Sequence, residues 1–520
     1  MTELVSRKSW GETLKAFIHP RVVTMFFYGI SAGIPLLLIF SSLSLWLREA
    51  GVEREAVTYF SWAALGYSFK FVWAPLVDKL PLPVLTRLLG RRRAWLLLSQ
   101  LSIMFAIGLM AFIDPATDPL TMMAWAAVIL GFSSATQDVV IDAYRIESAE
   151  SDLQALMSSS YIAGYRIGMI IAGAGALFLA SYWGSTTNSY NYLAWQLTYL
   201  AMAGVMLVGV ITTLMIPEPD TEYKENSDVE QRQHISFLLL FVMAALGFVA
   251  SFYFSADIAS DMKRALSVFL GNASFAAFII ELARLAVALL AAAAVTKCMI
   301  LSGLIEQDLV RNTYIEPVKD FFQRYGVALA WLLLALIGLY RISDIVLGVI
   351  SNVFYQDLGF TKIEIASVVK TFGLFMTIAG GFLGGLLAVR FGVMRILFLG
   401  ALLSALTNLL FMVLAAAGHD MVMLYIVISA DNLSAGLASA AFIAFLSSLT
   451  NISFTAVQYA IFSSLMTLLP KVLGGYSGSI VDSLGYQPFF LLTALMGVPV
   501  LILIIWASKQ FTLNDVVIRK

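Results

Sequence analysis

The chain has 520 residues, of which 60% are hydrophobic and 12% are charged. A water-soluble domain is about one-quarter charged, so this composition leaves too little polar side chain to cover a water-facing surface. The formal net charge is −1, which gives no electrostatic reason to expect nucleic acid as a partner. The composition therefore indicates an integral membrane protein, with the lipid bilayer as its surroundings.

The sequence offers little for metal, cofactor or nucleotide chemistry. Cys298 is the single cysteine, and the three histidines, His19, His234 and His419, lie far apart. A disulfide within the chain is excluded, and no metal site or cofactor is expected. The chain also lacks the G-x-x-x-x-G-K-[ST] loop that cradles nucleotide phosphates, so direct ATP-driven transport is disfavoured.

Apolar stretches long enough to cross a bilayer, which takes about 20 helical residues, recur fourteen times. In chain order the predicted spans cover residues 22–46, 57–77, 94–113, 120–144, 157–182, 192–216, 235–255, 272–300, 327–354, 363–388, 394–416, 421–448, 455–476 and 487–508.

Two polar segments divide these spans into groups of six, two and six. This grouping predicts an N-terminal segment, a six-helix bundle, a linker, an inserted helix pair, a second linker, a second six-helix bundle and a tail, at residues 1–21, 22–216, 217–234, 235–300, 301–326, 327–508 and 509–520. Two six-helix halves joined by a polar linker is the layout of the major facilitator fold. We therefore predict an all-α polytopic membrane protein of this fold with two inserted transmembrane helices.

The distribution of Lys and Arg between the loops predicts the orientation. With the N-terminus inside, the inner segments hold 21 of the 32 basic residues, Arg145 among them, and the outer segments hold 5. Cytoplasmic loops carry such an excess of positive charge. The bias supports the span count and places both termini in the cytoplasm.

The loop after the second span resembles the major facilitator signature G-x-x-x-D-R-x-G-R-R. It reads Ala74-Pro-Leu-Val-Asp78-Lys79 and, after an insertion, Gly90-Arg91-Arg92-Arg93. The matching loop of the second half has Val389 at the acidic position. The resemblance implies that Asp78, Arg91 and Arg92 help to gate the molecule. The alternative is a short turn whose positive charge only sets orientation.

Ionisable residues in the middle of spans are costly, at about 2.5–3.5 kcal/mol each on insertion scales, so each indicates a pair, a cavity or a function. They comprise Lys70, Asp138, Asp142 and Arg166 in the first half, Arg341, Asp344, Lys370 and Asp431 in the second half, and Glu281 and Arg284 in the inserted pair. For the last two a structural ion pair is favoured, because the insertion is peripheral to a twelve-helix core.

Asp138 and Asp142 lie one helical turn apart on one face of the fourth span. Two carboxylates at this spacing repel each other when both are ionised, so one is expected to hold a proton unless cations neutralise both. The pair is therefore a candidate for proton coupling, with Lys70 and Arg166 as countercharges. The alternative is a permanent salt-bridge cluster that fixes helix register.

Ordered motifs along both halves resemble the AmpG family of muropeptide permeases. They are Tyr28-Gly-Ile-Ser-Ala-Gly-Ile-Pro35, Phe69-Lys-Phe-Val-Trp-Ala-Pro-Leu-Val-Asp78, Ala135-Thr-Gln-Asp-Val-Val-Ile-Asp-Ala143, Gly164-Tyr-Arg-Ile-Gly-Met169, Ser343-Asp344, Lys370-Thr-Phe-Gly373, Asp431-Asn-Leu433 and Ser453-Phe-Thr-Ala-Val-Gln-Tyr459. The inserted spans depart from the shorter family pattern.

The resemblance implies a proton-driven carrier in the inner membrane of a Gram-negative bacterium. It would import N-acetylglucosaminyl-1,6-anhydro-N-acetylmuramyl peptides by alternating access, for cell-wall recycling and β-lactamase induction, and would act as a monomer. The acidic pair important in the family falls on Asp138 and Asp142.

The residues suit this anionic, hydroxyl-rich substrate. Cations at Lys70, Arg166, Arg341 and Lys370 are expected to bind its carboxylates, beside Asp344 and Asp431. Gln137, Tyr165, Asn432 and Gln458 are expected to bind its sugars. Two other hypotheses stay open: an importer of another anionic solute, such as a siderophore or acetyl-CoA, and a membrane-embedded transferase.

Overall fold

The protein is described here by a computed structural model. It describes residues 16–39, 41–52, 67, 70–148, 151–185, 189–219, 231–270, 273–360, 364–474 and 477–518. The regular structure of these residues is helical, as predicted. Contacts divide the chain into two compact units, Met1–Thr221 with Phe321–Lys520, and Glu222–Asp320.

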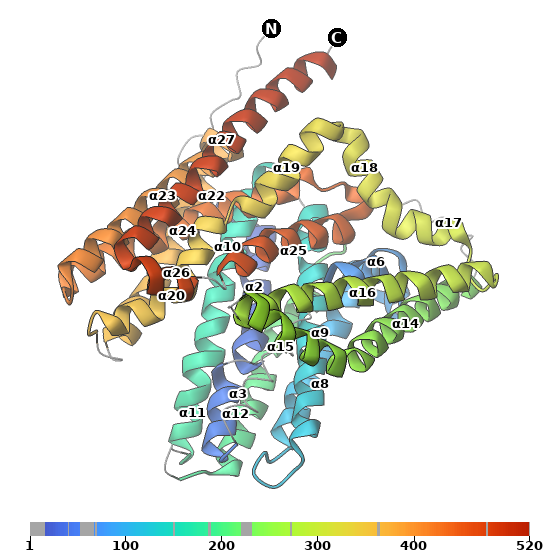
Figure 1. Cartoon of the computed structure of the whole chain (residues 1–520). Helices are drawn as coiled ribbons and strands as arrows, with labels where there is room; N and C mark the ends of the chain where they lie inside the picture. The colour runs from blue at the N-terminus through green and yellow to red at the C-terminus, as the bar shows by residue number, and fades with distance from the viewer. Residues whose placement is uncertain are drawn as a thin grey trace. The chain divides into compact units, whose positions relative to one another are not determined.

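The N-terminal bundle is built from long apolar helices and several short ones at their ends (Figure 1). Its elements are α2 (Pro20–Ile39), α3 (Ser41–Glu49), η3 (Lys70–Val72), α6 (Ala74–Lys79), α7 (Leu85–Leu89), α8 (Arg91–Ala111), α9 (Leu120–Ser148), α10 (Ser151–Ile170), η4 (Ile171–Gly175), α11 (Ala176–Tyr182), α12 (Tyr192–Val205) and α13 (Leu207–Met215).

Glycines bring α2 and α10 into backbone contact. A Cβ atom on Gly164 would lie 2.0 Å from the carbonyl oxygen of Phe26, and one on Gly33 would lie 2.1 Å from that of Tyr165. Small residues allow this close approach between membrane helices. The contact fixes the rotation of α10 about its own axis, and with it the directions in which Tyr161 and Arg166 project.

The C-terminal bundle is also built from long apolar helices and shorter ones, and it is drawn in yellow to red in Figure 1. Its elements are α19 (Val327–Leu339), α20 (Ile342–Asp357), η6 (Ile365–Phe372), α22 (Gly373–Phe391), α23 (Val393–Ala417), α24 (Met421–Leu449), η7 (Ile452–Phe454), α25 (Thr455–Gly474), α26 (Ser477–Leu484) and α27 (Tyr486–Ile518). Gly380 and Gly384 let α22 approach the backbone of α24 at Leu433 and Leu437.

The two bundles touch through α10 and α22. A Cβ atom on Gly385 of α22 would lie 2.0 Å from Ser159 Oγ and 3.0 Å from the carbonyl oxygen of Ala155, both on α10. These residues lie near the predicted cytoplasmic ends of the two helices. The small side chains therefore hold the bundles together at that end.

The second unit contains α14 (Gln231–Phe254), α15 (Ala256–Leu270), α16 (Ala273–Leu301), α17 (Gln307–Val310) and η5 (Arg311–Ile315), and it shares α18 (Glu316–Tyr325) with the first unit. Helices therefore form within residues 301–326, for which the sequence predicts a polar linker.

Ten described helical stretches are long and apolar enough to cross a membrane, or eleven if α14 and α15 form one bent crossing. The chain is thus a multi-pass membrane protein, while the predicted total of fourteen is not reached among the described residues. The predicted span at residues 57–77 falls largely outside those residues. Two more correspond to shorter apolar stretches, Ala286–Leu301 and Ile452–Thr467.

Candidate functional site

Arg92 is the centre of a buried ionic cluster at the predicted cytoplasmic end, where α8 begins. Its guanidinium Nη2 lies 2.8 Å from Asp78 Oδ1 of α6, and its Nε donates to Glu147 Oε2 of α9 at 2.9 Å. Nη2 also donates to Glu147 Oε1. Arg92 is 1% exposed, so the N–H groups of its guanidinium form these hydrogen bonds inside the protein.

The cluster reaches across to the C-terminal bundle. Arg92 Nη2 donates to Thr455 Oγ1 at 2.7 Å, at the first residue of α25. The Asp78 carboxylate accepts hydrogen bonds from the backbone N–H groups of Ala456 at 3.2 Å and Val457 at 3.1 Å. A carboxylate at a helix N-terminus satisfies free N–H groups and complements the helix dipole. We call Asp78, Arg92, Glu147 and Thr455 the gate cluster.

The sequence predicts Asp78, Arg91 and Arg92 as one group, and the structure brings them together. Arg91 Nη1 donates to the Asp78 carbonyl oxygen at 2.7 Å. The loop signature contains neither Glu147 nor Thr455, so the sequence does not predict them as gate residues, although Thr455 lies within the motif Ser453–Tyr459. A usable signal for Glu147 is a third carboxylate that follows Asp142 at the same helix end.

Glu218 caps the start of α8. Its two carboxylate oxygens accept from the backbone N–H groups of Arg92 at 2.7 Å and Arg93 at 3.0 Å. A Cβ atom on Gly90, whose φ is +88°, would lie 2.5 Å from the Glu218 side chain. Burial raises the pKa of the Glu218 carboxyl, against the lowering effect of these two donors. The cap therefore depends on a glycine at position 90.

The two acidic residues of α9 have different surroundings. Asp142 pairs with two cations, since its Oδ2 lies 3.7 Å from Lys70 Nζ and its Oδ1 lies 3.1 Å from Arg145 Nη2. Among the described residues, the hydrogen bond that the Asp138 carboxylate accepts is from Tyr161 Oη at 3.4 Å. Within the part of the chain that the structure describes, Asp142 thus has two cations within 4 Å of its carboxylate, whereas Asp138 has none at that distance.

Arg145 is part of this site and not of a loop. The loop-charge count places it among the cytoplasmic loop residues, but its side chain is 0% exposed. Its Nη1 donates to Ser158 Oγ at 3.2 Å and to Ser447 Oγ of α24, and its guanidinium lies 5.1 Å from the centre of the Tyr459 ring. Arg145 therefore joins α9 and α10 to the C-terminal bundle.

The C-terminal bundle contains a second polar cluster around α23. Asp344 Oδ2 lies 3.6 Å from Nε of Arg341, which precedes it by three residues, and Asp344 accepts a hydrogen bond from Ser404. Asp431 Oδ1 of α24 accepts from Thr407 Oγ1 at 3.4 Å. Arg341 thus pairs with Asp344 and also donates to Ser439 Oγ at 3.0 Å, whereas the hydrogen bond that Asp431 accepts comes from a hydroxyl group.

Arg166 has no carboxylate partner among the described residues. The polar contact of its guanidinium there is with Met169 Sδ, at 3.9 Å from Nη1. The Tyr165 ring centre lies 6.0 Å from that of Tyr161, and Gln137 faces α2, where it accepts from Ser31 Oγ at 3.0 Å. Arg166 is therefore a half-buried cation that is available to an anion.

Three more of the predicted cavity residues lie on three different elements of the C-terminal bundle. Gln458 accepts from Arg324 Nη2 at 3.1 Å and from the backbone N–H of Asn451 at 2.8 Å, beyond the end of α24. Asn432 bonds to Thr377 at 2.9 Å, where α22 and α24 pack. Lys370 is exposed on η6. Of the predicted sugar-binding residues, Gln458 is thus bonded to the linker helix α18, while its neighbours Val457 and Tyr459 contact Asp78 and Arg145.

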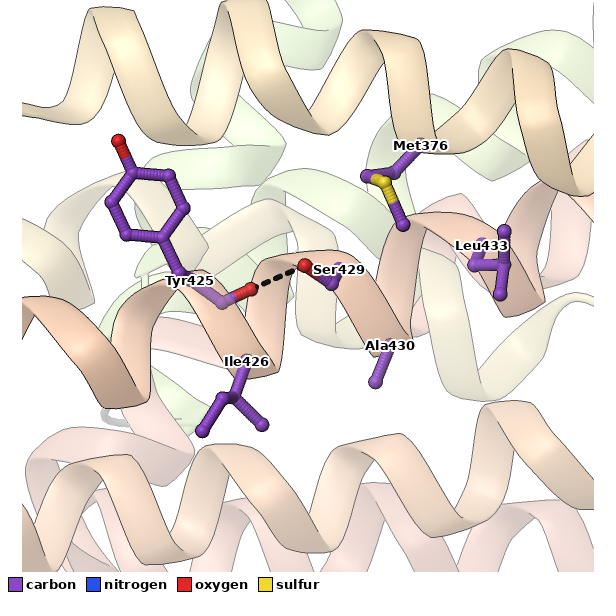
Figure 2. Close-up of a pocket in the computed structure, with 6 residues that line it drawn as sticks. All are labelled: Met376, Tyr425, Ile426, Ser429, Ala430 and Leu433. Atoms are coloured by element: carbon purple, nitrogen blue, oxygen red, sulfur yellow. Dashed lines mark hydrogen bonds between the residues drawn. The ribbon is translucent and has the colours of Figure 1, made fainter.

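An open apolar hollow of about 400 Å³ lies on α22 and α24, and none of the predicted site residues is among those that line it. Figure 2 shows its lining, Met376, Tyr425, Ile426, Ser429, Ala430 and Leu433, with Ser429 bonded back to the Tyr425 carbonyl at 2.6 Å. Its hydroxyl is thus used within the helix. Among the described residues no group of three or more potential metal ligands is found.

Sequence comparisons with known proteins find one superfamily and relatives that are named as transporters. A sequence model of the Major Facilitator Superfamily matches residues 21–305. The chain is 30% identical to "Putative transporter AmpG 4" of Rickettsia conorii, over 95% of this chain and 98% of the relative. It is 27% identical to the "Anhydromuropeptide permease" of Escherichia coli, over 95% of this chain and 80% of the relative.

Solved structures show the same fold at low sequence identity. The proton:xylose symporter XylE matches with a TM-score of 0.59 at 12% identity, over 94% of this chain and 95% of the symporter. The human organic anion transporter MFSD10 matches with a TM-score of 0.53 at 13% identity, over 93% of this chain and 99% of that transporter.

Proposed function

The chain belongs to the major facilitator superfamily, and from this premise we propose that it is a proton-coupled importer of anhydro-muropeptides. The substrate would be N-acetylglucosaminyl-1,6-anhydro-N-acetylmuramyl peptides, carried by alternating access across a bacterial inner membrane for wall recycling. Relatives named AmpG and anhydromuropeptide permease support this substrate. Those relatives are transporters, which disfavours the membrane-embedded transferase.

The contrast between Asp138 and Asp142 carries the proposal of proton coupling. Asp142 has Lys70 and Arg145 as partners, so its charge is neutralised. Asp138 lies one turn away with a tyrosine hydroxyl as its hydrogen-bond donor. An ionised carboxylate in low dielectric without a close cation is costly. Asp138 is therefore the carboxylate that we assign to carry the proton.

The same charges suit an anionic substrate. Arg166 of the N-terminal bundle lacks a carboxylate partner among the described residues, and the Nε of Arg341 is buried without a hydrogen bond there. A guanidinium is the side chain best suited to bind a carboxylate through two parallel hydrogen bonds. We assign both arginines to the peptide carboxylates of the muropeptide. Protons would then compensate the cost of moving this anion inward against an inside-negative potential.

The gate cluster would close the predicted cytoplasmic end while the substrate enters from the other side. It joins α6, α8 and α9 to the N-terminus of α25. Inward opening requires these contacts to break, because they connect the two bundles that must separate. We therefore assign Asp78, Arg91 and Arg92 to gating.

Uptake into proteoliposomes tests the proposal. Labelled anhydro-muropeptide should accumulate when the vesicle interior is made alkaline, and should only equilibrate without a gradient. Asp138→Asn should abolish accumulation and retain equilibration. Accumulation that ignores the gradient would refute proton coupling, and normal accumulation by Asp138→Asn would refute its assigned role.

Another anionic solute is the second candidate, because arginine side chains recognise carboxylates and phosphates alike. A protein that equilibrates a siderophore or acetyl-CoA and leaves muropeptide outside would favour it. The same vesicles can make this comparison, with competition by unlabelled solutes.

A further inference from the structure

Helix α15 of the inserted unit turns away from the span that precedes it. Helix α14 has 24 residues, which is about 36 Å of helix and enough to cross a hydrocarbon core of about 30 Å. After Phe254 the axis bends by 51° into α15. The crossing can therefore be complete before α15 begins, on the side opposite the predicted cytoplasmic end of α14.

The side chains of α15 form three lengthwise stripes. One stripe packs toward α16 and includes the buried Ala259. The second is exposed and carries the charges of Asp257, Asp261 and Arg264, and it ends at the apolar Val268. The third is exposed and wholly apolar, and it comprises Ile258, Met262, Ala265 and Phe269. Residues spaced by three or four positions share one face of a helix.

The exposed apolar stripe is large. Ile258, Met262 and Phe269 are 63%, 52% and 84% exposed. On the charged stripe Arg264 pairs with Asp261 at 2.7 Å, and both side chains remain open to the surroundings. A helix with these two exposed faces fits neither water alone nor hydrocarbon alone, because each medium penalises one of the stripes.

We propose that α15 is an in-plane helix that binds the surface of the lipid bilayer. Its apolar stripe would enter among the acyl chains, and its charged stripe would face water. The partner is the apolar layer beneath the headgroups and not an anionic headgroup, because the negative charges of Asp257 and Asp261 offset the positive charges of Lys263 and Arg264. The insertion would thereby anchor the inserted unit to the outer surface of the membrane.

Arg284 of α16 holds the bend that places α15 in this position. It donates to the carbonyl oxygen of Phe252 at 2.7 Å and to Ser255 Oγ at 3.2 Å, and its guanidinium lies 4.8 Å from the centre of the Phe252 ring. Carbonyl groups at a helix end need such donors. The arginine therefore has a structural task at the break. The side chain of its predicted partner, Glu281, lies outside the described part of the chain.

Spin labels on the full-length protein in vesicles test the proposal. Cys298→Ser removes the single cysteine, and new cysteines are then placed in two matched pairs of neighbours, Asp257→Cys with Ile258→Cys and Asp261→Cys with Met262→Cys. Oxygen concentrates in hydrocarbon and a nickel chelate stays in water. Labels at 258 and 262 should show a several-fold higher ratio of oxygen to nickel accessibility than their neighbours.

Two reference positions and two lipid compositions complete the design. Val242→Cys on the exposed face of α14 reports hydrocarbon, and Asp118→Cys in the loop before α9 reports water. The contrast within each pair should persist in purely zwitterionic lipid. Equal, water-like values for all four labels would overturn the proposal, and so would equal, hydrocarbon-like values, which would make α15 part of a broken span. Loss of the contrast without anionic lipid would overturn the choice of partner.

Discussion

Replacing Asp78 by asparagine should loosen the closed end of the molecule. The Asp78 carboxylate makes three close polar contacts, with Arg92 at 2.8 Å and with the N–H groups of Ala456 and Val457 at 3.2 and 3.1 Å. Two of the three join the N-terminal bundle to α25. Asparagine keeps one acceptor oxygen and removes the charge that favours the helix N-terminus.

The expected loss follows from these contacts. A hydrogen bond to a charged group contributes about 1.5–3 kcal/mol, and the amide retains part of it. A net loss of about 2–3 kcal/mol shifts the equilibrium from the closed toward the open state of the predicted cytoplasmic end by roughly 30- to 150-fold. Asp78 is 5% exposed, so solvent screening reduces this effect little.

Distances between spin labels measure the shift. In the Cys298→Ser background, one label near the end of α7 and one at the start of α25 should report a longer distance in Asp78→Asn. Asp118→Asn is the matched control, because that exposed carboxylate lies at the opposite end of α8 and α9. An unchanged distance distribution in Asp78→Asn would refute the claim that this carboxylate holds the bundles together.

Three further predictions concern stability. Asp142→Asn should lower the melting temperature markedly, because both Lys70 and Arg145 lose their carboxylate partner and removing one partner from a buried pair costs about 3–5 kcal/mol. Asp138→Asn should change the melting temperature little. Equal effects of the two substitutions would contradict the distinction between the two residues. Gly90→Ala should lower the melting temperature of the protein more than Gly303→Ala. Both glycines have positive φ, but an added Cβ meets the Glu218 side chain at position 90 and open space at position 303. Similar melting temperatures of the two variants would rule out the clash with Glu218. Finally, burial raises the folded-state pKa of Glu218 above its ordinary value of 4.5, so its protonation favours the folded state. Relative to Glu218→Gln, the wild type should gain stability as the pH falls from neutral toward 4.5 and lose that gain as the pH rises, and a difference that does not vary with pH would contradict the shift.

Several features of the fold could be predicted because they depend on local composition. The bilayer sorts residues by polarity, so apolar runs of about 20 residues reveal membrane helices whatever their neighbours are. The ends of α8, α9 and α23 accordingly fall close to the predicted spans at residues 94–113, 120–144 and 394–416. The same sorting makes a charged residue in a span conspicuous, and for that reason Asp138 and Asp142 stand out in the sequence.

The charge of a residue near a span end does not by itself show whether that residue lies in a cytoplasmic loop. Arg145 follows an apolar run and carries a positive charge, which is also what a cytoplasmic loop residue looks like. Its burial beside Asp142 depends on Ser447 and Tyr459, about 300 residues away. Gln458 shows the converse, because a polar residue within a predicted span lies with Arg324 at a helix end.

The sequence by itself determined that this is a helical membrane protein with an acidic pair in one helix, and it predicted two six-helix halves and a gating role for Asp78. Only the tertiary structure decided which carboxylate of the pair is neutralised, and that Asp78 caps a helix 378 positions further along. The periodicity and polarity of a segment indicate which of its residues are exposed to lipid, to water or to the protein interior. The pairing of charges depends on which helix faces approach within about 4 Å, and that is set by the packing of the whole bundle.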